Sequence, residues 1–141
     1  MKKLLTAIFT LLFVLNLSAQ KQNTVTADNP VVEKFTQIYN FNDAQVEKMI
    51  KVQERRLRNL AEIQTLRATD AKTYHQKRNA INKGTEVSIG LILNPEQIVI
   101  LNEARVNLRK EKAKKTIELK EAGLSYEEIQ IALIDLEDTL Y

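Results

Sequence analysis

Cysteine and tryptophan are absent from this 141-residue chain, and histidine occurs once, at His75. Without cysteine the protein forms no disulfide bond, performs no thiol chemistry and offers no cysteine for a lipid anchor. One imidazole is too few for a tight transition-metal site, and neither Ser88 nor Ser125 lies in a nucleophile motif. We therefore expect His75 at the surface, no enzyme activity, no metal and no other cofactor.

Glycine and proline are also scarce, with three and two residues in the whole chain. No glycine-rich loop is present that could hold a phosphate group. No long stretch alternates apolar and polar side chains as a half-buried strand would. Helix signals are abundant instead, so the sequence predicts an all-α fold.

The first 19 residues have the pattern of a secretory signal peptide. Lys2 and Lys3 precede an apolar run from Leu4 to Leu15, and Leu17-Ser18-Ala19 supplies small residues for cleavage. A membrane-spanning helix needs roughly 20 apolar residues, and this run is shorter. We expect cleavage near Ala19/Gln20, export to the periplasm and no membrane anchor in the mature protein.

The remaining chain is long enough for one domain with a hydrophobic core. Residues 20–29 are expected to form a flexible leader and residues 30–141 a single all-helical domain. Loss of Lys2 and Lys3 lowers the formal charge by two from +3, so the mature protein is nearly neutral. We therefore expect no nucleic-acid partner.

Charge is segregated along the domain. Lys and Arg predominate from Lys51 to Lys115, whereas Lys120 is the one base between Thr116 and Tyr141, among many acids. The acidic tail can fold back on the basic body, or two chains can meet head to tail. Both segments can equally be solvated helix faces, and the charge pattern does not choose between these arrangements.

Capping residues divide the domain into four to five helices. The helix starts are marked by Asp28-Asn29-Pro30, Asn42, Asp70, Asn94-Pro95 and Ser125, and Gly123 ends the helix before Ser125. Apolar residues at three- and four-residue steps extend the second helix to Leu66. The stretch from Arg109 to Thr116 has no large apolar residue and is expected to be exposed or to project beyond the body.

The last helix carries a continuous apolar seam at steps of three and four residues: Tyr126, Ile129, Leu133, Leu136 and Leu140. Such a seam packs against another helix, either in its own chain or in a second copy. We expect it to support association in a homodimer. The corresponding alternative function is a structural or interaction protein that binds a fixed partner, or itself, through this helix.

Two of the caps repeat one motif. Phe41-Asn42-Asp43-Ala44-Gln45 and Leu93-Asn94-Pro95-Glu96-Gln97 each contain an apolar residue, a capping Asn and a Gln three residues later. This is a hydrophobic residue followed by a capping box. On these motifs, their spacing and the export signal, the chain resembles the Spy/CpxP-like family of periplasmic stress proteins, which carries two Leu-Thr-x-x-Gln motifs. Asn replaces Thr in both copies here, and Phe41 replaces the first Leu.

The resemblance covers roughly residues 35 to 112 and leaves out the last helix. It implies antiparallel helical hairpins that dimerise, and ATP-independent holding of unfolded envelope proteins or damping of an envelope stress sensor. The basic residues Arg55, Arg56 and Arg58 are the candidate client-binding surface, because charge can attract a client before apolar contact is made. The motif residues Asn42, Gln45, Asn94 and Gln97 are expected to cap helices.

Overall fold

A computed structural model describes residues 25–140, so the predicted signal peptide lies outside the described residues. The described range is all-α, without strands, and contains six helices: α1 (Pro30–Tyr39), α2 (Asp43–Ile63), α3 (Leu66–Thr69), α4 (Ala71–Gly90), α5 (Pro95–Glu121) and α6 (Tyr126–Asp138). The all-α prediction is confirmed. The sequence predicted four to five helices. It predicted a single helix to Leu66 where the structure has two, because α2 ends at Ile63 and the short α3 follows it.

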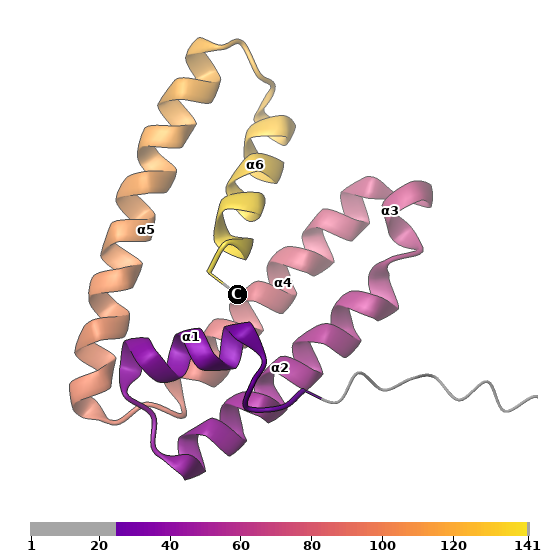
Figure 1. Ribbon diagram of the computed structural model, residues 1–141. Coiled ribbons are helices and arrows are strands. Elements are labelled where there is room, and N and C mark those ends of the chain that lie inside the picture. The colour runs from indigo at the N-terminus through magenta and orange to yellow at the C-terminus, as the bar shows by residue number, and fades with distance from the viewer. Residues whose placement is uncertain (1–24, 141) are drawn as a thin grey trace, which may run out of the picture.

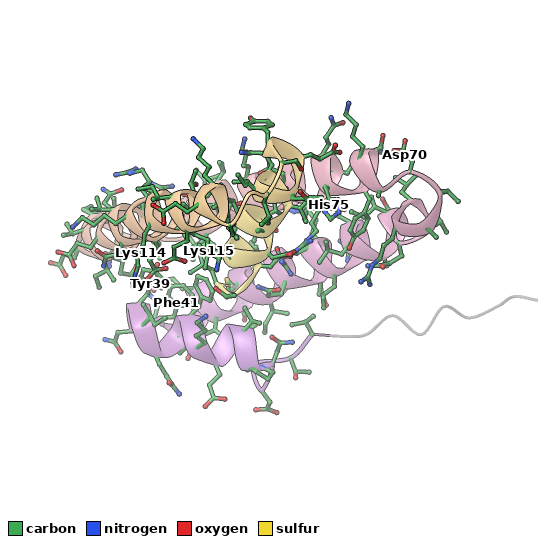
Figure 2. All side chains as sticks on the ribbon, turned by 90° about the horizontal axis from the view of Figure 1, so that it is seen from above. Tyr39, Phe41, Asp70, His75, Lys114 and Lys115 are labelled. Carbon is green, nitrogen blue, oxygen red and sulfur yellow. The ribbon has the colours of Figure 1, made fainter. Side chains whose placement is uncertain are left out.

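The helices form two antiparallel pairs, α2 with α4 and α5 with α6 (Figure 1). α4 and α5 diverge from the loop that joins them, and α6 runs back between them and contacts both (Figure 1). α1 lies across one face at the base of this arrangement, as the two views together show (Figures 1 and 2). Within residues 25–140, no helix combines the length and the apolar composition that crossing a bilayer requires.

Local chemistry explains where the helices begin. Asn29 accepts hydrogen bonds from the backbone N–H groups of Val31 and Val32, and Pro30 occupies the first turn. Asp70 caps α4 by accepting a hydrogen bond from the N–H of Thr73 (3.0 Å). Hydrogen bonding by the side chain and then the backbone of Thr73 lowers the pKa of the Asp70 carboxyl group. Side-chain oxygens at helix starts satisfy N–H groups that have no partner within the helix.

The main core lies at the base, where α1, α2, the end of α4 and the start of α5 meet. Val32, Met49 and Ile89 are its most deeply buried side chains. Tyr39 and Phe41 stack with ring centroids 5.7 Å apart and lie between α1 and α5 in Figure 2. Among the described residues this core takes no side chain from α6. The main core is therefore complete without the last helix.

Val25 also belongs to the core, which departs from the flexible leader expected over residues 20–29. The N–H of Asn29 donates to the Thr26 carbonyl (3.0 Å), and this turn leads the chain from Val25 into α1. The free energy gained by burying the Val25 side chain outweighs the effect of the polar residues around it. The polar stretch from Arg109 to Thr116 is mostly exposed, as expected, but α6 packs along α5 there.

Candidate functional site

The two capping motifs meet in the interior. Asn42 accepts a hydrogen bond from the Gln45 backbone N–H (3.0 Å), and the Gln45 side chain accepts one from the Asn42 N–H (3.1 Å). Asn94 and Gln97 form the same reciprocal pair at the start of α5, with both distances at 2.9 Å. Both glutamines are buried. Each helix therefore begins with a complete capping box whose glutamine points inward.

The two glutamine side chains also bind each other. Gln45 Nε2 donates to Gln97 Oε1 (2.7 Å), and Gln97 Nε2 donates to Gln45 Oε1 (3.2 Å). Their amide groups further donate to backbone carbonyls, Gln45 to Ile92 (3.0 Å) and Gln97 to Tyr39 (2.7 Å). The amide groups are thus fully hydrogen-bonded, as buried polar groups require. We call this arrangement the glutamine clasp. It joins α1, α2 and α5 and leaves no free group there for a ligand.

The three arginines predicted to bind clients do not form one surface. Arg55 and Arg58 are exposed one turn apart on α2, whereas Arg56 is only 7% exposed. Consecutive helical residues point about 100° apart, so Arg56 cannot share their side. Arg56 nevertheless lines a groove between α2 and α4 together with Arg55, so its assignment to a client-binding surface stays a prediction. Arg55 and Arg58 remain available on the outside of the protein.

Arg55 lies at a shallow, open groove between α2 and α4. We call it the α2–α4 groove, and its lining residues are Arg55, Arg56, Asn59, Ala80, Ile81, Gly84, Thr85 and Ser88. The Arg55 guanidinium donates to Ser88 Oγ across the groove (2.5 Å). A Cβ placed on Gly84 would meet no neighbouring side chain or helix within 4 Å. Packing inside the chain therefore does not require a glycine at position 84. Because glycine has no side chain, the α4 wall of the groove is low at this position.

Arg56 also belongs to an acid–base network that holds α6. Asp138 accepts hydrogen bonds from Arg56 (3.2 Å), from Asn82 (2.7 Å) and from Arg78. Arg78 also donates to Asp135 (2.5 Å). Burial alone would lower the pKa of Arg78, but hydrogen bonds to the two aspartates outweigh burial and raise it. The acidic tail therefore folds back on the basic body of its own chain.

Two further contacts fix the same helix. Lys112 of α5 bonds to Glu137, and Lys34 of α1 donates to the carbonyls of Thr139 and Leu140, both at 3.1 Å. These contacts place positive charge near the C-terminal end of α6, where the helix dipole favours it. α6 and the residues just after it are thus held by side chains of four other helices, α1, α2, α4 and α5.

The predicted C-terminal seam is largely buried within one chain. Ile129 and Leu133 are buried where α6 packs between α4 and α5, and Leu136 and Leu140 are partly buried. Tyr126 is 77% exposed and lies outside the buried seam. Of the two arrangements expected for the seam, packing within its own chain holds for Ile129 and Leu133, and support of a homodimer by this helix stays a prediction.

His75 also differs from its expected place at the surface. It is half-buried beside Tyr74, whose ring it meets edge-on at a centroid distance of 5.2 Å. Over residues 25–140, no three His, Cys, Asp or Glu side chains lie where they could together hold a metal ion.

Sequence reasoning missed the contact between the two glutamines and the cluster of Arg78, Asn82 and Asp138. The segregation of acids and bases was a signal for the cluster, but it did not identify the partners. Compared with known proteins, the chain matches no family model, no curated protein and no solved structure.

Proposed function

We propose that this chain is an exported helical binding protein that holds unfolded envelope proteins without ATP, through the α2–α4 groove and the α4 surface beside it. One observation carries the proposal. Val87 and Leu91 are 61% and 82% exposed, next to a groove whose rim carries the cationic side chain of Arg55. Exposed apolar side chains gathered beside polar ones are typical of interaction sites.

Helical spacing places these groups on one side of α4. Four residues follow one another at steps of three, one and three positions and therefore lie in adjacent rows on the helix surface: Gly84, Val87, Ser88 and Leu91. Ser88 and Gly84 line the groove, and Val87 and Leu91 therefore continue it as an apolar margin. A client can place apolar side chains on this margin while its backbone lies along the low wall at Gly84.

The chemistry suits an unfolded, acidic segment. Arg55 attracts carboxylates over several ångströms and can donate to backbone carbonyls, and Asn59 adds an amide to the same rim. Apolar contact with Val87 and Leu91 then adds affinity, in proportion to the small area that is covered. Binding of this kind is weak and reversible. When a client folds, it buries its own apolar side chains and dissociates, so its release needs no ATP.

Two further points support the proposal. The resemblance to the Spy/CpxP-like family, carried by Asn42, Gln45, Asn94 and Gln97, implies the same kind of activity. The alternative, association of the chain through its C-terminal seam, has less support because Ile129 and Leu133 are buried within the chain.

An aggregation-suppression assay tests the proposal. Several unrelated denatured proteins are diluted into buffer with and without the mature chain, and light scattering is followed. The wild-type chain should suppress scattering for several of them, and Arg55→Glu and Val87→Asp should each weaken this. The matched controls Arg109→Glu and Ile38→Asp, both at exposed positions outside the groove, should leave it unchanged. Protection of a single obligate partner, or full activity of both groove variants, would refute the proposed function.

A further inference from the structure

The outer side of α5 carries an apolar stripe that its own chain leaves uncovered. Its members are spaced by seven, seven and four residues and are all exposed: Val99, Val106, Ala113 and Ile117. Val99 and Ile117 are 57% and 58% exposed. The spacing keeps the four side chains in one row on the helix. The row extends for about 27 Å along α5, at 1.5 Å per residue.

The described contacts of α5 with the rest of the protein are made by other sides of the helix. Leu101 is buried in the main core, Arg105 bonds to Glu86 of α4, and Lys112 bonds to Glu137 of α6. Figure 1 shows α5 at one edge of the molecule, with α6 along its inner side only. The stripe thus lies about a third of a helical turn away from the side that packs.

Charges beside the stripe indicate what can cover it. Glu96 and Glu103 lie along one flank in the first half of α5, and Lys110 and Lys114 continue the same flank in the second half. All four are exposed. When two such helices pair antiparallel, the acidic half of each flank faces the basic half of the other. In a parallel pair this flank would face the other flank of the partner helix, so these Glu–Lys pairs would not form.

We propose that the outer side of α5 is a self-association surface, on which α5 of a second copy packs antiparallel. Val99 of one copy then lies near Ile117 of the other, and Val106 lies close to the two-fold axis. Glu103 faces the partner's Lys110 and Lys114. The surface is separate from the α2–α4 groove, so the proposal does not rest on client binding.

Mass measurement across a concentration series tests the surface. We expect a dimer of the wild-type chain, and Val99→Asp or Ile117→Asp should raise its dissociation constant by about tenfold or more, because each places a charge in the contact. Both positions are exposed, so circular dichroism should show unchanged helix content. The matched control is Ile38→Asp, an exposed apolar residue of α1 outside both proposed surfaces, and it should dimerise as the wild type does. A monomeric wild type, or unchanged dimers of both α5 variants, would overturn the proposal.

The absence of cysteine allows a direct test of direction. Val99→Cys and Ile117→Cys are prepared separately and oxidised alone and as a mixture. In the antiparallel arrangement the mixture forms a disulfide-linked heterodimer, while each variant alone stays largely unlinked, since its two cysteines lie about 27 Å apart. Efficient linking of each variant to itself would indicate a parallel pair and would overturn the antiparallel assignment. No linking in the mixture would do the same.

Discussion

The glutamine clasp makes a quantitative prediction for Gln97→Ala. The substitution removes the bond to the Asn94 N–H, the bond to the Tyr39 carbonyl and the bonds to Gln45. Each hydrogen bond contributes about 1 kcal/mol net, so the four bonds together contribute about 4 kcal/mol. We expect the free energy of unfolding to fall by about 4 kcal/mol. That is a large share of the roughly 5–15 kcal/mol that stabilises a typical domain.

Urea denaturation followed by circular dichroism measures this loss as a lower midpoint at a similar slope. The matched control is Gln37→Ala, whose exposed side chain makes one bond to Glu33 (3.1 Å) and whose loss should cost less than about 0.5 kcal/mol. A double-mutant cycle with Gln45→Ala should give a coupling energy of about 1–3 kcal/mol. A loss below about 1 kcal/mol, or a coupling near zero, would refute the clasp as a source of stability.

Three further predictions concern α6. Asp138→Ala should lower the free energy of unfolding by about 3 kcal/mol in urea titrations, because Arg56 stays buried without that carboxylate; an unchanged midpoint would contradict the network. Hydrogen bonds from Ser125 hold the pKa of Glu128 below its ordinary value of 4.5, so its stabilisation is present above that value and lost as pH falls through the lowered pKa. In Glu128→Gln the melting temperature should therefore change less with pH on the acid side than in the wild type. A pH profile parallel to that of the wild type would count against the cap. Leu133→Asp should undock α6 and reduce helical circular dichroism, whereas full helix content and an unchanged melting temperature would mean that the residue is not buried.

The helix starts were predictable because they depend on residues that lie close together in sequence. A cap at Asn42, Asn94 or Ser125 needs a side chain and an N–H group two or three residues away. The printed sequence contains both partners of each cap. The same holds for the turn after α5, where Gly123 adopts a positive φ of 81° that glycine accommodates without strain.

The contacts that join distant parts of the chain were not predictable in this way. Gln45 and Gln97 are separated by 52 positions, and Arg56 and Asp138 by 82. Charge segregation allowed an intramolecular or an intermolecular pairing, and only packing decides between them. Val25 was missed because a single apolar residue in a polar segment has no periodicity that could reveal its burial.

The proposed client surface can be tested most directly by site-specific crosslinking in the cysteine-free chain. A photoreactive probe is attached to Val87→Cys beside the groove or to Ile38→Cys on α1, both at exposed apolar positions. Each labelled protein is then illuminated with a denatured client and, separately, with the same client folded. We expect crosslinks from position 87 to the denatured client only, and few from position 38. Equal crosslinking from both positions, or none from position 87 while aggregation is still suppressed, would contradict the account.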